Sequence, residues 1–138
     1  AHATPDGIRN IIKNVRTVND WLTRDEAVVD EYNAGKLTTF LFTVNGYRGL
    51  MNMILYVRKP RNIERIPKNL PMLMISGLDD PVGEYGKGVY RAYNSYHGHI
   101  DDIDLRLYED CRHELCNELN KEEIYEEIYG WIMNHMSK

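Results

Sequence analysis

The sequence predicts an α/β fold in which a helical segment, residues 1–66, precedes strand, helix, strand and helix over residues 67–138. Before Pro67 the apolar residues recur only at helical spacing. After Pro71 comes an unbroken apolar run at 72–75, and later an alternating stretch at 104–108. Because a helical pattern separates these two strands, we expect a parallel pair joined by a crossover helix.

Composition limits the class of protein. The 138 residues fit one domain at most, at roughly 100–200 residues per domain. A net charge of −4 excludes an electrostatic grip on nucleic acid. No apolar run approaches the ~20 residues of a membrane helix, so no integral membrane segment is expected. Two cysteines cannot form a disulfide framework, and with no secretory signal they favour the cytoplasm.

Three helices are predicted before Pro67. The first covers residues 8–15, where Ile and Val fall at helical spacing. The second begins at a capping box formed by Thr23 and Glu26 and ends near Gly35. The third covers residues 44–57 and ends before Pro60.

The second half alternates between strands and helices. The apolar run at 72–75 is typical of a strand buried on both faces. A helix is expected at about 85–97. In the stretch 104–108 the leucines face one way, while Arg106 and Tyr108 form a wetter face. The last helix begins at Asn120, where a second capping box is expected.

Two loops follow the two strands and should meet at one edge of the sheet. Parallel strands place their carboxyl ends together, which is where open α/β sheets hold their sites. The first loop contains Asp79 and Asp80, and the second contains His113. An acid and a histidine are two members of a nucleophile–His–acid triad, in the chain order of the α/β hydrolases. Alternatively, an Asp caps a turn and His113 is a surface residue.

Several stretches closely resemble one branch of the α/β hydrolases, the bacterial lysophospholipase and monoacylglycerol-lipase-like enzymes, also named serine aminopeptidase-like. They are LPMLMISGLDDPVGEYGKGV, LRLYEDCRHELCNE and KEEIYEEIYGWI. The upstream stretches DWLTRDEAVVDEYNAG and FLFTVNGYRGL resemble the lid of these enzymes. The resemblance implies a lid at 1–66, part of the core at 67–138, Asp80 as the triad acid (with Asp79 as the alternative) and His113 as the base. It also implies a monoacylglycerol or lysophospholipid ester as substrate, with no cofactor or metal.

The nucleophile elbow of this family, G-x-S-x-G, does not occur in the sequence. The serines are Ser76 in the first strand, Ser95 in a helix and Ser137 at the end. We therefore expect a fragment whose nucleophile lies outside this chain, and which is inactive alone. Two strands leave an open edge, so self-association or pairing with the missing N-terminal part is expected. The alternative function is a non-catalytic interaction module derived from a hydrolase.

Three other groups of residues admit a second interpretation. The stretch His97-Gly-His99-Ile-Asp101-Asp102 resembles a zinc motif, but its last histidine is replaced and a solvated loop is favoured. Cys111, His113 and Cys116 lack a fourth ligand, and Cys111 and His113 are expected to point apart. Apolar side chains around the third helix are expected to pack in a core, or in part to line an acyl-chain pocket in the lid. They are Phe40, Phe42, Tyr47, Met51 and Met53.

Overall fold

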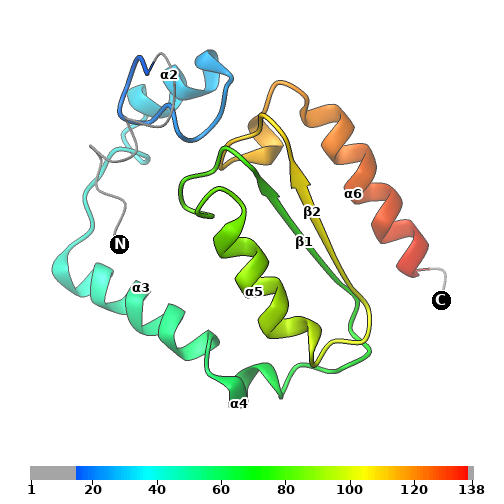
Figure 1. The fold of residues 1–138 in the computed structure, drawn as a ribbon. Helices are drawn as coiled ribbons and strands as arrows, with labels where there is room; N and C mark the ends of the chain where they lie inside the picture. Colours follow the sequence, from blue (N-terminus) through cyan, green and yellow to red (C-terminus); the bar gives the residue numbers. More distant parts are fainter. Residues whose placement is uncertain (1–14, 137–138) are drawn as a thin grey trace.

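The chain folds as a helical segment followed by a parallel β-α-β unit and a final helix (Figure 1). The computed structural model describes residues 15–136. The helix predicted at 8–15 therefore lies outside the described residues except for Val15, and so does Ser137.

Helix α2, Glu26–Ala34, forms where it was predicted but begins differently. Its N-cap is Asp25, whose carboxylate accepts a hydrogen bond from the backbone N–H of Ala27. The predicted Thr23 capping box is wrong. The Thr23 hydroxyl instead donates to the carbonyl oxygen of Asn117 at 2.8 Å, because a distant loop competes for it.

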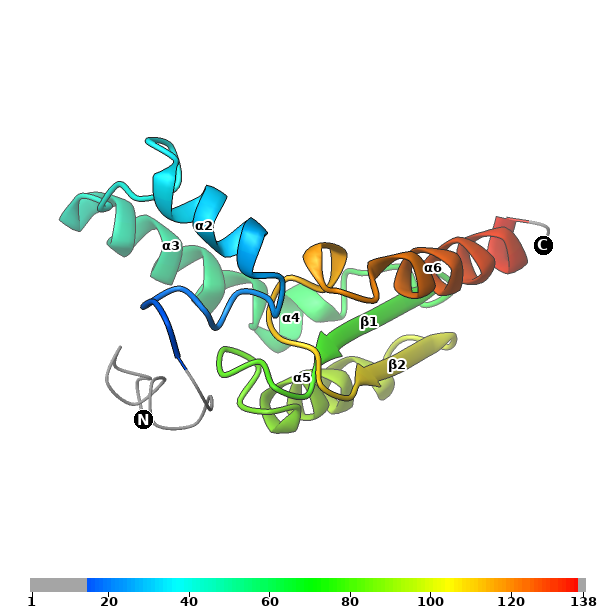
Figure 2. The ribbon, with the colours of Figure 1, turned by 90° about the horizontal axis from the view of Figure 1, so that it is seen from above.

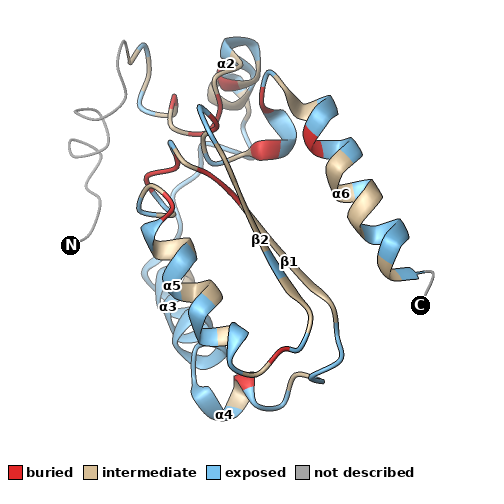
Figure 3. Ribbon diagram, turned by 45° about the vertical axis from the view of Figure 1, so that its right-hand side comes forward, coloured by how far each residue is buried: buried red, intermediate tan, exposed pale blue. Residues whose placement is uncertain are grey.

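Helix α3, Val44–Val57, confirms the predicted third helix, and Thr43 caps it by accepting from the N–H of Gly46. The short helix α4, Pro60–Ile63, follows, so Pro60 starts a helix as well as limiting the previous one. No residue of α3 is buried, and Figure 3 shows this helix in the colour of exposed residues. The expectation that Phe40, Phe42, Tyr47, Met51 and Met53 are core residues is therefore wrong for the described part of the chain.

The sheet confirms the predicted α/β class. Strand β1, Met72–Gly77, pairs in parallel with β2, Ile103–Tyr108, and Met72 lies opposite Ile103. Helix α5, Lys87–His97, connects them. Both strands therefore end at the same edge, as the sequence predicts.

Helices cover the two faces of the sheet. Figures 1 and 2 show α5 on one side and α6, Lys121–Met136, on the other. The prediction that residues 72–75 are buried on both faces is wrong, because they are half-buried in a sheet that has two strands within the described residues. The predicted wetter face of β2 is half-buried too, since the Arg106 guanidinium and the Tyr108 hydroxyl both donate to Glu127 of α6.

Most of the buried residues gather at the carboxyl ends of the strands, whereas Ile63 and Ile100 lie at the other end of the sheet (Figure 3). At the carboxyl ends, Cys111, Leu115 and Ile124 form a buried cluster, and side chains of β1, β2 and α6 pack against it. This cluster supports the two loops in which the site residues were predicted. Among residues 15–136, no helix has both the length and the apolar character that a membrane crossing requires.

Candidate active site

The loops after β1 and β2 run against each other through backbone contacts. The N–H of Leu78 donates to the carbonyl oxygen of Tyr108 at 2.8 Å, and that of Asp79 donates to Cys111 at 2.9 Å. Gly77 makes this approach possible, because a Cβ atom there would lie 2.0 Å from the carbonyl oxygen of Cys111. The close contact fixes the spacing between the segment carrying Asp80 and the segment carrying His113.

Asp80 and His113 meet at this edge of the sheet. Oδ2 of Asp80 lies 3.1 Å from Nδ1 of His113, and Oδ1 accepts from the N–H of Val82 at 2.8 Å. Asp80 is 5% exposed, whereas Asp79 is an exposed residue. Of the two acids that the sequence left open, Asp80 is the one that contacts the histidine.

The turn after Asp80 has an unusual backbone. Glu84 and Tyr85 both adopt left-handed conformations, with φ of 53° and 55°, before Gly86. The N–H of Tyr85 donates to the carbonyl oxygen of Asp80 at 2.9 Å, which closes the turn. Burial, followed by the charges of Asp79 and Asp80, raises the pKa of the Tyr85 phenol.

The partners of His113 define its electrostatics. Its hydrogen bond to Asp80 raises the imidazole pKa, partial burial opposes this, and the charges of Asp80 and Glu114 add to the increase. A carboxylate only accepts hydrogen bonds, so Nδ1 carries the proton and Nε2 is the nitrogen that can accept one. The Trp21 ring lies beside the imidazole, with 5.0 Å between ring centroids. The pair therefore presents a basic imidazole nitrogen, oriented by a buried acid, at the edge of the sheet.

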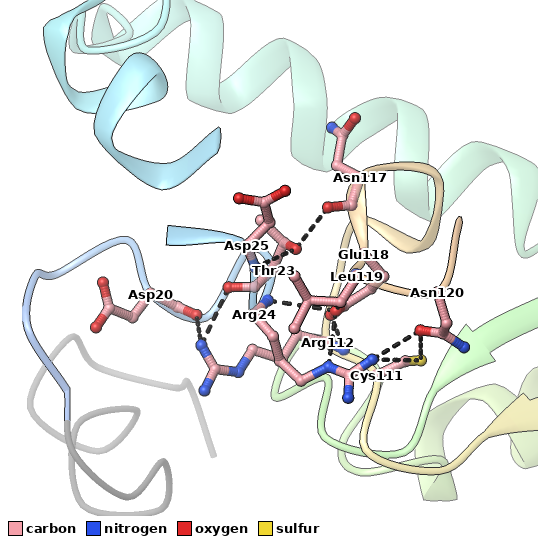
Figure 4. Close-up of polar contacts among 10 residues, drawn as sticks. All are labelled: Asp20, Thr23, Arg24, Asp25, Cys111, Arg112, Asn117, Glu118, Leu119 and Asn120. Carbon is pink, nitrogen blue, oxygen red and sulfur yellow. Dashed lines mark hydrogen bonds and ion pairs between the residues drawn. The ribbon is translucent and has the colours of Figure 1, made fainter. Parts of the chain in front are cut away.

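A second set of contacts joins the loop carrying His113 to residues 20–24 (Figure 4). Its centre is Glu118, which is 0% exposed and forms an ion pair with Arg24 at 2.8 Å. Arg112 donates from its backbone N–H to Glu118 and from its guanidinium to the carbonyl oxygens of Asp20 and Thr23. We call residues 20–24 the strap.

This network was not predicted from the sequence, in which Thr23 has the pattern of a helix cap and neither Trp21 nor Arg24 belongs to a motif. Glu118 was interpreted only as part of the lead-in to the last helix. A usable signal was present, since the resemblance to R-H-E-L-x-N-E includes Glu118 as well as His113.

The side-chain positions do not support the zinc motif at 97–102 or a reactive or metal-binding role for Cys111. His99 places Nε2 2.7 Å from the carbonyl oxygen of Ile66. Cys111 is buried with its thiol near Arg24 and Asn120, and burial raises its pKa. Over residues 15–136, no three His, Cys, Asp or Glu side chains are arranged to hold a metal ion.

A cavity of about 570 Å³ opens between α5 and the turn after Asp80. Apolar side chains from β1, the turn and α5 line part of it, and two arginines line it as well. These residues are Met74, Val82, Val89, Arg58 and Arg91.

The parallel β-α-β unit with its flanking helices is part of an α/β-hydrolase fold. The chain belongs to the serine aminopeptidase S33 family (Hydrolase_4), whose model matches residues 7–120. No curated protein matches the chain.

Two solved structures resemble the fold. A highly thermostable carboxyl esterase from Bacillus coagulans, in complex with glycerol, is 25% identical with a TM-score of 0.74, over 91% of this chain and 40% of the esterase. A lipase in an open form is 19% identical with a TM-score of 0.76, over 96% of this chain and 44% of the lipase. The chain thus spans about two fifths of the length of either enzyme.

Proposed function

We propose that Asp80 and His113 are the acid and the base of a Ser–His–Asp triad that hydrolyses carboxylic esters. The observation that carries the proposal is the 3.1 Å contact between the buried Asp80 carboxylate and Nδ1 of His113. In this role Asp80 holds the imidazole tautomer and stabilises its cation, while Nε2 takes the nucleophile's proton and returns it to the leaving alcohol.

The nucleophile in this proposal is a serine outside the 138 residues. The sequence has no G-x-S-x-G, and Ser76, in β1, is buried and directs its hydroxyl to the carbonyl oxygen of Gly77. The chain matches about two fifths of an esterase and of a lipase, so the remainder of such a fold is the natural source of the serine. The 138 residues alone should then give no turnover, because the covalent route has no nucleophile.

A lipid-like ester, such as a monoacylglycerol or a lysophospholipid, is the proposed substrate. The support is an apolar face on α3 and its preceding loop, in the segment 1–66 that we propose as the lid. Its side chains are exposed within the described part of the chain: Phe40, Phe42, Tyr47, Met51 and Met53. Flexible, apolar side chains suit an acyl chain, and the cavity is lined in part by Val82 and Gly83 of the turn after Asp80, although neither Asp80 nor His113 lines it.

The test uses the protein isolated from its natural source through a tag on this chain, together with any polypeptide that carries or accompanies it. We expect a fluorophosphonate probe to label a serine outside residues 1–138, and a short-chain ester to be hydrolysed. His113→Gln and Asp80→Asn should each lower kcat by about 10⁴-fold or more. The matched control is His97→Gln, at an exposed histidine at the end of α5, which should leave kcat unchanged.

Three results would overturn the proposal. The first is a probe adduct on a residue of this chain. The second is hydrolysis that is unaffected by His113→Gln. The third is a natural sample with neither labelling nor hydrolysis, which would favour a non-catalytic interaction module.

A further inference from the structure

The loop that carries His113 is held by residues 20–24, the strap, as well as by the loop after β1. The His113 side chain is 38% exposed, so packing alone does not fix the imidazole. The strap instead runs along this loop, with the N–H of His113 directed at the carbonyl oxygen of Trp21, and that of Glu114 at Leu22, 2.7 Å away. The side chain of Thr23 adds a hydrogen bond to the carbonyl oxygen of Asn117.

Glu118 lies where these contacts converge (Figure 4). Its Oε2 accepts from Nε of Arg24 at 2.8 Å and from the backbone N–H of Arg24 at 3.3 Å. Its Oε1 accepts from the backbone N–H of Arg112 at 2.7 Å. One carboxylate therefore bonds the strap with one oxygen and the residue next to His113 with the other.

Burying this carboxylate is costly unless its partners are strong. A fully buried charge loses its hydration, and only paired, hydrogen-bonded charges recover that free energy. Burial opposes the charge on Arg24, but its hydrogen bond and attraction to Glu118 outweigh this and raise the Arg24 pKa. A glutamine at 118 would present an N–H₂ group to Arg24 or to the N–H of Arg112, so one contact would set donor against donor.

We propose that Glu118 is a positioning residue for His113. Through Arg24 and the backbone of Arg112 it fastens the loop to the strap, and this keeps Nδ1 of His113 within reach of Asp80. The effect of Glu118 on catalysis depends on the proposed triad. Its effect on the Asp80–His113 contact does not depend on that proposal.

The test is an NMR titration of the His113 ring in the full chain, which needs no turnover. In the wild type we expect a His113 pKa above the ordinary 6.5, owing first to the bond with Asp80. Glu118→Gln should lower this pKa toward 6.5 and speed hydrogen exchange at the N–H of Arg112. The matched control, Glu122→Gln, removes one carboxylate from the exposed side of α6 and should change neither quantity.

Thr23→Val provides a second, milder variant, because it removes one hydroxyl from the strap at nearly constant shape. We expect a smaller fall of the His113 pKa in the same direction. A folded Glu118→Gln with unchanged His113 pKa and unchanged exchange at Arg112 would overturn the proposal. If Glu118→Gln does not fold, an unchanged pKa in folded Thr23→Val would overturn it.

Failure of the proposed hydrolysis would look different. The titration reads the Asp80–His113 contact directly, so it can succeed even if no ester is cleaved. In the active protein Glu118→Gln should lower kcat and leave KM nearly unchanged, since Glu118 touches no substrate in this role.

Discussion

Two regions of the chain differ in burial. One is the junction between the strap and the loop after β2, and the other is helix α3. At the junction, polar and apolar side chains are fully enclosed, including Glu118, Cys111 and Ile124. Helix α3 is rich in large apolar residues, yet none of its residues is buried. One region is completed by contacts within the chain, and the other presents apolar surface that nothing in the described residues covers.

The buried junction is stabilised by residues of this chain, whereas the apolar surface of α3 is available to contact something else. Soluble monomers rarely expose large continuous apolar patches, and those that exist usually mark a binding surface. The chain also spans about two fifths of the esterase and the lipase that it resembles. The junction, by contrast, holds the loop of His113 through contacts between residues of this chain.

The strongest test of this contrast truncates one apolar residue in each region. Ile124→Ala should lower the free energy of unfolding by about 2–5 kcal/mol, because it leaves a cavity in the buried cluster. Leu50→Ala on α3 should cost less, about 1 kcal/mol, because Leu50 is already 37% exposed. Both sites are helical, and the gain in helix propensity on substitution by alanine is slightly larger for Ile124 than for Leu50, which works against the expected difference.

Urea unfolding of both variants at several protein concentrations measures the difference. Equal losses in the two variants would contradict the contrast. A loss in Leu50→Ala that grows with protein concentration would show that a second copy of the chain covers α3.

The next prediction concerns the close approach of the two site loops. Gly77→Ala should destabilise the chain by about 1–3 kcal/mol, because its Cβ would lie 2.0 Å from the carbonyl oxygen of Cys111. Gly98→Ala is the matched control, since no atom beyond its two chain neighbours lies within 4 Å of its Cβ position and its φ of −76° suits alanine. Alanine there should leave stability unchanged or raise it slightly.

Thermal unfolding gives the stability of both glycine variants, and the His113 titration reports on the loops. If Gly77→Ala is as stable as the wild type and keeps the His113 pKa, the close contact does not set the spacing of the site.

Local patterns in the sequence were enough for most elements of the fold. The period of the apolar residues predicted α3, α5 and β2, and an unbroken apolar run predicted β1. Parallel pairing then brought the loop of Asp80 beside the loop of His113. Burial was predicted less well, because β1 and α3 depend on neighbours that a local pattern does not reveal. The bond between Arg24 and Glu118 joins residues 94 positions apart, and no local spacing encodes it.

The smallest predicted effect is the pH dependence of the Asp80–His113 contact. A raised pKa means that the folded chain favours protonated His113, so this stabilisation is complete below pH 6.5 and disappears as pH rises through the raised pKa. Because the imidazole is partly exposed, we expect less than about 1 kcal/mol. Urea unfolding of the wild type and His113→Gln at about pH 5.5 and about pH 8 should show the wild-type advantage only at the lower pH. An advantage that increases with pH would mean that neutral His113 is the form the fold prefers, and that Asp80 does not hold the imidazole as a cation.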